Sequence, residues 1–144
     1  MLTERAMSET FDLVHYGELM GAKMHDDAIA YVDRFRAEDP NDPDLRRYAA
    51  LARGAKGEHA MESFDRMEIR PSPQRIEDTV RLFQEAIDVD PGLADPYWDL
   101  AVIHGRFKQD PISAGRYLAT ARKLGYQHPM MPELERMIVG MVRR

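Results

Sequence analysis

Cysteine is absent from this chain of 144 residues, which excludes disulfide bonds, thiolate metal sites and cysteine nucleophiles. Long apolar runs are also missing. The run Met137-Ile138-Val139 near the C terminus is far below the roughly 20 residues that a membrane helix needs. The N-terminal segment MLTERAMSETFD has no apolar signal core. We therefore expect a cytoplasmic protein with no membrane span.

Basic clusters are lacking as well. The formal net charge is −5, and no group of lysines and arginines is long enough to follow a phosphate backbone, so nucleic acid is not an expected partner. The five histidines are scattered without metal-ligand spacing, and no phosphate-binding or dinucleotide-binding glycine pattern occurs. We expect no metal ion, no cofactor and no catalytic residues.

Apolar residues, at 44% of the chain, are plentiful enough for one domain with a core, and the length is too short for two ordinary domains. Their spacing is helical: Ile76, Val80, Phe83 and Ile87 lie four, three and four residues apart. The pattern predicts a helix that ends at Asp90, because Pro91 follows.

Asp-Pro pairs mark the ends of several predicted helices. Asp39-Pro40 and Asp90-Pro91 each stop a helix, and each is followed by a second Asp-Pro, at 42–43 and 95–96. Asp95-Pro96 and Asp110-Pro111 offer an N-cap side chain and a proline at the first helical position. This duplication indicates an internal repeat.

The residues of that repeat resemble the tetratricopeptide repeat, a helix pair of 34 residues with small residues where the helices cross. The resemblance is carried by Phe83, Ala86 and Pro91, by Tyr97-x-x-Leu100-Ala101-x-x-His104, and by Ala114-x3-Leu118-x2-Ala121. Departures are Tyr97, Ala101 and His104, which stand where the family has tryptophan, glycine and tyrosine, and no proline closes the unit after Ala121.

The resemblance implies an all-α fold, a short right-handed array of antiparallel helix pairs, as a single domain over 1–144. Pro40 and Pro91 lie 51 residues apart, more than one repeat, which predicts an insertion at about 55–72. The expected repeat pairs are about 4–38, 43–89 and 96–124, with a capping helix at 132–144. The individual helices are expected near 4–22, 25–38, 43–68, 73–89, 96–108, 111–124 and 132–142.

Apolar stripes are also predicted at both ends of the chain. Met7, Phe11, Val14 and Leu19 form a loose face on the first helix. Leu124-Gly125 ends a helix with a left-handed cap. The last helix is predicted to have an apolar face of Leu134, Met137, Ile138, Met141 and Val142.

In the family, the first helix of each pair lines a concave surface that receives a peptide. The resemblance therefore implies protein binding, and we take Arg47, Leu51, Trp98, Val102 and Arg106 as candidate groove residues. Trp98 and Val102 form a second apolar line on their helix, so they either face an open groove or are buried under residues 58–70 or the first helix. A chaperone-tail clamp is not expected, because the single asparagine, Asn41, lies in a turn.

Four functions remain open at this point. The first is a non-enzymatic binding adaptor or scaffold, and the second is an escort for a secreted or assembling protein. The third, a small helical enzyme or a regulatory subunit, requires convergent titratable groups, of which His104, His59 and Asp99 are the first to inspect. The fourth is self-assembly through the methionine-rich last helix. His104 is expected in the core with one ring nitrogen hydrogen-bonded.

Overall fold

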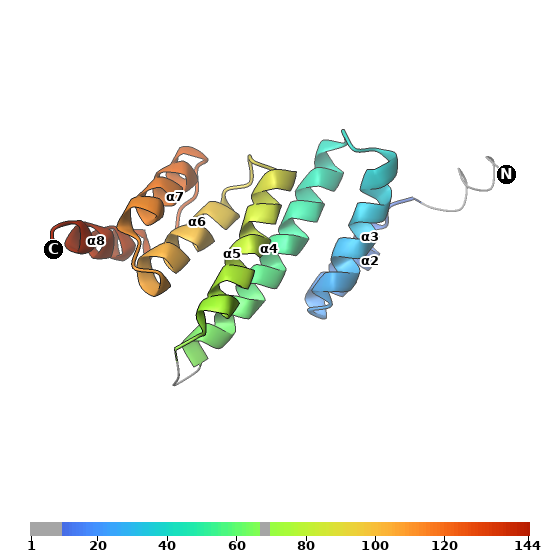
Figure 1. Cartoon of the computed structure of the whole chain (residues 1–144). Coiled ribbons are helices and arrows are strands. Elements are labelled where there is room, and N and C mark those ends of the chain that lie inside the picture. The colour runs from blue at the N-terminus through green and yellow to red at the C-terminus, as the bar shows by residue number, and fades with distance from the viewer. Residues whose placement is uncertain (1–9, 67–69) are drawn as a thin grey trace.

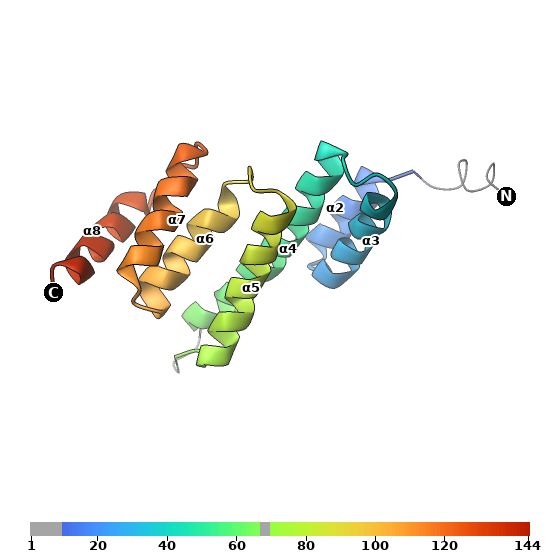
Figure 2. The same ribbon diagram turned by 45° about the horizontal axis from the view of Figure 1, so that its top comes forward.

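The computed structural model describes residues 10–66 and 70–144, and within these ranges the chain is built of helices with no β-strand. Successive helices stand in a row from the N to the C terminus (Figures 1 and 2). The all-α class is thereby confirmed. The helices are α2 (Leu13–Gly21), α3 (His25–Glu38), α4 (Pro43–Arg66), α5 (Pro73–Val89), α6 (Asp95–Val102), the π-helix η1 (Ile103–Phe107), α7 (Pro111–Lys123) and α8 (Met131–Val142).

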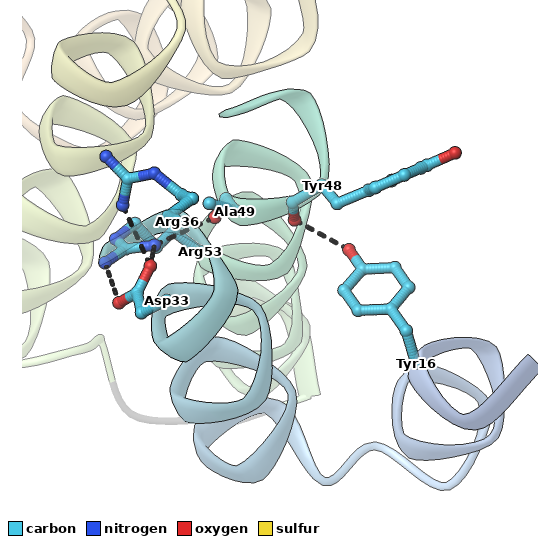
Figure 3. Close-up of polar contacts among 6 residues, drawn as sticks. All are labelled: Tyr16, Asp33, Arg36, Tyr48, Ala49 and Arg53. Atoms are coloured by element: carbon cyan, nitrogen blue, oxygen red, sulfur yellow. Dashed lines mark hydrogen bonds and ion pairs between the residues drawn. The ribbon is translucent and has the colours of Figure 1, made fainter. Parts of the chain in front are cut away.

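Each helix packs against the next one along the chain, from α2 to α8. Alternate helices also meet. The Tyr16 hydroxyl on α2 donates a 2.7 Å hydrogen bond to the Tyr48 carbonyl on α4 (Figure 3), α4 contacts α6, and η1 contacts α8. Helices α2, α4, α6 with η1, and α8 are therefore neighbours in one layer.

Most of the predicted helix ends are confirmed. Asp42 caps α4 through hydrogen bonds from the Asp44 and Leu45 backbone N–H groups, at 2.8 and 3.3 Å. Ser72 and Asp110 cap α5 and α7 in the same way, each with a bond of 3.2 Å. Gly125 adopts φ +87°, the left-handed conformation expected after α7.

One predicted cap and one predicted boundary are wrong. The N-cap of α6 is Ala94, which makes no side-chain cap bond, and Asp95 lies inside the helix instead of capping it. The first helix was expected to include residues 10–12, but α2 starts at Leu13 because the Asp12 side chain accepts the Val14 and His15 N–H groups. The remainder of that predicted start, residues 4–9 with Met7, lies outside the described residues.

The apolar core is a chain of adjoining clusters, one for each set of neighbouring helices. Ile76, Val80 and Phe83 are buried as their spacing predicts, and so are the crossing residues Ala101 and Ala114, which have no exposed surface. Val14 is 69% exposed, so its assignment to the apolar face of the first helix is wrong. Phe11, just before α2, and Leu19 pack against the first cluster as predicted.

The apolar face predicted for the last helix is only partly correct. Leu134 and Ile138 are buried and Met141 packs partly against the same cluster, but Met137 and Val142 are exposed to 38% and 65%. Met131, the first residue of α8, is buried as well, so the buried residues of this helix lie closer to its start than predicted. One side of α8 therefore faces solvent with apolar side chains.

Helix α4 is the longest helix in the described residues and passes through Gly54 and Gly57 without a break. At Gly57 the Phe83 ring of α5 comes so close that an added Cβ would lie 2.7 Å from its tip. Beyond this point the extra turns carry Phe64, whose ring meets Phe107 of η1 edge-on with centroids 5.3 Å apart. These turns occupy part of the predicted insertion at about 55–72, and Phe64 packs them against the end of η1.

A partly buried ion pair between Arg53 and Asp33 connects α4 to α3 (Figure 3). The Arg53 guanidinium donates to both Asp33 oxygens, at 3.2 and 2.6 Å, and to the Ala49 carbonyl at 3.1 Å. Arg36 donates to the same carboxylate at 2.9 Å. Desolvation acts to raise the pKa of Asp33, but the hydrogen bonds from Arg53 and Arg36 outweigh it and leave that pKa lowered.

None of the described helices is both long and apolar enough to cross a membrane.

Candidate functional site

A groove of about 480 Å³ opens between α4, α6, η1 and α8, a size within the range typical of ligand pockets. Every helix that lines it belongs to the same layer of the fold. We call it the α4–α6–α8 groove. Its lining residues are Met61 from α4, Trp98, Asp99 and Val102 from α6, Arg106 from η1, Glu133, Leu134 and Met137 from α8, and His128 and Met130 from the connection before α8.

The position of Trp98 is fixed by aromatic stacking. Its ring lies 5.8 Å from that of Tyr126 and 4.7 Å from that of His128, both nearly parallel, so the connection between α7 and α8 covers it. Trp98 is consequently only 6% exposed. Removing this ring would disturb the core as well as the groove, so Trp98 is a poor residue with which to test binding alone.

Asp99 is the polar residue of the groove with the least solvent contact, at 9% exposed. Its carboxyl has no hydrogen-bond or ion-pair partner among the described residues, and its oxygens keep a small contact with solvent in the groove. Burial raises the pKa of Asp99 to about 9, and the negative charges of Glu58 and Asp95 add to the rise. At neutral pH this side chain is therefore held in its protonated form.

The surroundings of Asp99 are acidic on several elements. Glu58 of α4 keeps solvent contact, yet desolvation raises its pKa, followed by the charges of Asp95 and Glu62. Burial raises the pKa of Tyr126 to about 12, with further contributions from the Asp99, Asp95 and Glu58 charges. The start of α6 thus lies in a negative field to which α4 and α6 both contribute.

Three of the five candidate groove residues, Trp98, Val102 and Arg106, line this one groove. The other two lie elsewhere. The Arg47 Nε donates to Asp90 Oδ2 at 2.5 Å, and Asp90 Oδ1 accepts the Gly92 N–H at 3.1 Å, so Arg47 holds the turn between α5 and α6. Leu51 packs against the small cluster of Ala50, Ala86 and Leu93.

Of the segments that the sequence suggests could bury Trp98, residues 58–70 and the first helix, neither is the main one. The rings over it belong to Tyr126 and His128, which precede the last helix, whereas the 58–70 segment contributes Met61 to the groove wall. Sequence reasoning missed Met130 and Glu133 as lining residues too. Sequence patterns are local, so they do not predict that the connection before α8 packs against α6, which lies some 30 residues earlier. The one residue that could have indicated the groove was Asp99, an acid three residues before Val102 on an otherwise apolar side of the helix.

The histidines do not converge on Asp99. His104 is buried and stacks on Tyr117 at 5.3 Å, and among the described residues neither ring nitrogen has a hydrogen-bond partner, contrary to the expectation of one. Burial and then Lys108 lower the pKa of His104. His59 lies on α4 with its ring 5.5 Å from His25. The three titratable residues considered for an enzyme are therefore in different places.

A further hollow, of about 570 Å³, lies at the opposite end of the molecule between Phe11, Tyr31 and Arg34. It is shallow and adjoins the residues that precede Thr10, which the structure does not describe. The α4–α6–α8 groove instead takes its described walls from four helices and the connection before α8.

Within residues 10–66 and 70–144, no group of three or more histidine, cysteine, aspartate or glutamate side chains could hold a metal ion. In the comparisons with known proteins, no family model, no curated protein and no solved structure matches this chain.

Proposed function

We propose that this chain is a non-enzymatic, cytoplasmic adaptor that binds a protein or peptide on the α4–α6–α8 groove. Its helices then form a short tetratricopeptide-like array, with α2 and α3, α4 and α5, and α6 and α7 as pairs and α8 as the cap. The contacts of α2 with α4, of α4 with α6 and of η1 with α8 support this arrangement, and so does the full burial of Ala101 and Ala114 between α6 and α7.

The observation that carries the proposal is the groove itself. It lies in the layer of α4, α6 and α8, the helices that would line the concave face of such an array, and its walls are mostly apolar. A concavity between packed helices is rigid, and a rigid receptor avoids much of the entropy cost of association.

Val102 offers the cleanest test because it lines the groove and is only partly buried. We expect a Val102→Glu chain, used as bait in native cytosol, to lose a partner that the unaltered chain retains. Ile112→Glu is the matched control, since Ile112 is 65% exposed on α7 outside the groove. Loss of the partner with both variants, or with neither, would count against binding at this groove.

Self-assembly through the last helix is the second candidate. Val139 and Val142 on α8 are 44% and 65% exposed, and Met137 is 38% exposed, which leaves apolar surface on the outer side of that helix. Light scattering over a hundredfold range of concentration separates this function from a monomeric adaptor.

A further inference from the structure

We propose that the α4–α6–α8 groove receives a lysine or arginine side chain of the partner, whose stem packs between Met61, Trp98 and Val102 and whose cationic tip pairs with Asp99. The inference rests on the proposed function and names the chemistry of the bound segment: a basic residue flanked by apolar ones. It concerns a peptide and not a second copy of this chain.

The state of the Asp99 carboxyl is the first argument. Buried polar groups in folded proteins are nearly always hydrogen-bonded, because an unsatisfied one forfeits its hydration without compensation. Asp99 is only 9% exposed, lines the groove and has no partner among the described residues, so its carboxyl is hydrated only through the small solvent contact that it keeps in the groove. A donor supplied from inside the groove would satisfy it.

Charge complementarity identifies that donor as a cation. Asp95 lies one helical turn before Asp99 on α6, Glu58 approaches from α4, and Glu133 lines the groove from α8. The basic lining residue Arg106 comes seven positions later, roughly 10 Å farther along the helix. The Asp99 end of the groove therefore favours a positive group.

The walls fit the rest of such a side chain. Lysine and arginine bury an aliphatic stem while their heads stay at a polar site. Met61, Met130 and Met137 provide flexible thioether surface, and Met130 and Met137 are still 48% and 38% exposed in the free chain. The Trp98 indole, which is covered by Tyr126 and His128, contributes an apolar edge to the same wall.

Binding of a cation in this way is coupled to a proton. Because the pKa of Asp99 is about 9 in the free chain, pairing with a cation requires the carboxyl to lose its proton. Affinity should then rise as pH rises toward 9, by up to about tenfold per pH unit for one proton. The groups that face Asp99 or share its groove are Glu58 from α4, Asp95 from α6, Arg106 from η1, Tyr126 and His128 from the connection, and Glu133 from α8.

Peptides of the form acetyl-Ala-Leu-Xaa-Leu-Ala-amide, with lysine, arginine, norleucine or glutamate at Xaa, test the inference on the full chain. We expect the lysine and arginine peptides to shift the Trp98 indole and Val102 methyl NMR signals and to bind at least tenfold more tightly than the norleucine peptide. Their affinity should fall at least tenfold in Asp99→Asn and lose its pH dependence. Asp88→Asn, a change at an exposed acid of α5, should bind normally.

Equal affinity of the norleucine and lysine peptides, or no shift by either up to about 5 mM, would overturn the inference. So would unchanged lysine binding by Asp99→Asn, with its fold verified by circular dichroism, or preference for the glutamate peptide. Glu58→Gln provides a second variant, which should weaken lysine binding to a smaller extent. If the peptides fail while Val102→Glu still loses its cellular partner, adaptor function stands and only this ligand chemistry is wrong.

Discussion

At the scale of single residues, Trp98 and Asp99 differ in what surrounds their side chains. Trp98 and Asp99 are neighbours on α6, and both are nearly inaccessible to solvent. The Trp98 ring packs against the Tyr126 and His128 rings, whereas the Asp99 carboxyl has no partner among the described residues. The negative charges of Glu58 and Asp95 also act on it. Asp99 therefore makes the folded chain less stable at neutral pH than an uncharged residue of the same shape would.

Replacing Asp99 by asparagine should raise stability in a pH-dependent way. The pKa of Asp99 is raised from 3.8 to about 9 on folding, so between those pH values the folded chain holds a proton that the unfolded chain releases. The contribution of Asp99 to the free energy of unfolding is therefore greatest below about pH 4. It falls as pH rises toward 9, by up to about 1.4 kcal/mol per pH unit. Asparagine cannot ionise and has no such dependence.

Thermal unfolding at pH 5 and pH 8 measures this difference. The advantage of Asp99→Asn over the unaltered chain should already exist at pH 5, which lies above 3.8, and should grow up to pH 8. Three pH units at up to about 1.4 kcal/mol each give a further gain of up to about 4 kcal/mol, or about 8–16 °C in melting temperature. Asp88→Asn should follow the unaltered chain at both values. Parallel profiles for all three proteins would show that Asp99 ionises normally.

At the scale of helices, the sequence predicted most of what local chemistry decides. Proline-bearing stops and side-chain caps such as Asp42, Ser72 and Asp110 act within a few residues, so the ends of α4, α5 and α7 could be located from the sequence. The π-turn of η1 could not, because nothing in its five residues distinguishes it from α-helix. The contacts of Met61 and His128 with the groove depend on packing over long sequence distances, which periodicity does not encode.

The crossing of α4 and α5 at Gly57 gives a prediction with a control in the same helix. Gly57→Ala would press a methyl group against the buried Phe83 ring, and overpacking of this kind costs about 1–3 kcal/mol, more than the gain in helix propensity of about 1 kcal/mol. Gly54→Ala meets nothing within 4 Å and gains only the propensity. Urea midpoints should therefore move in opposite directions, and a rise with both substitutions would show that Phe83 has room to move.

At the scale of the whole molecule, the fold is a row of clusters that each depend on their neighbours. Three of the four clusters in the described residues extend beyond one helix pair: Tyr16 of α2 reaches α4, Phe64 of α4 reaches η1, and Leu134 of α8 reaches the cluster of α6 and α7. Stability in such a row is approximately a sum of terms between neighbouring units, so the last unit needs a cap over its apolar face.

Helix α8 is that cap, and its removal should have effects beyond the C terminus. Met131, Leu134 and Ile138 pack on Ala114 and Leu118, so deleting residues 131–144 would expose the whole of this cluster. At about 1.5–3 kcal/mol for each of the three lost side chains, we expect a loss of several kcal/mol in the urea unfolding free energy, together with aggregation seen by light scattering. The deletion also removes the α8 wall of the groove, so binding of the lysine peptide should disappear.

A double substitution on the exposed side of the same helix distinguishes a cap from an assembly surface. Val139→Ser with Val142→Ser alters residues that are 44% and 65% exposed, and should leave both the urea midpoint and lysine-peptide binding unchanged. If the unaltered chain self-associates and the double variant is monomeric, α8 has two separate faces, one for the core and one for assembly. A truncated chain that stays monomeric, equally stable and able to bind the peptide would contradict the assignment of α8 as the cap, because a cap cannot be removed without exposing what it covers.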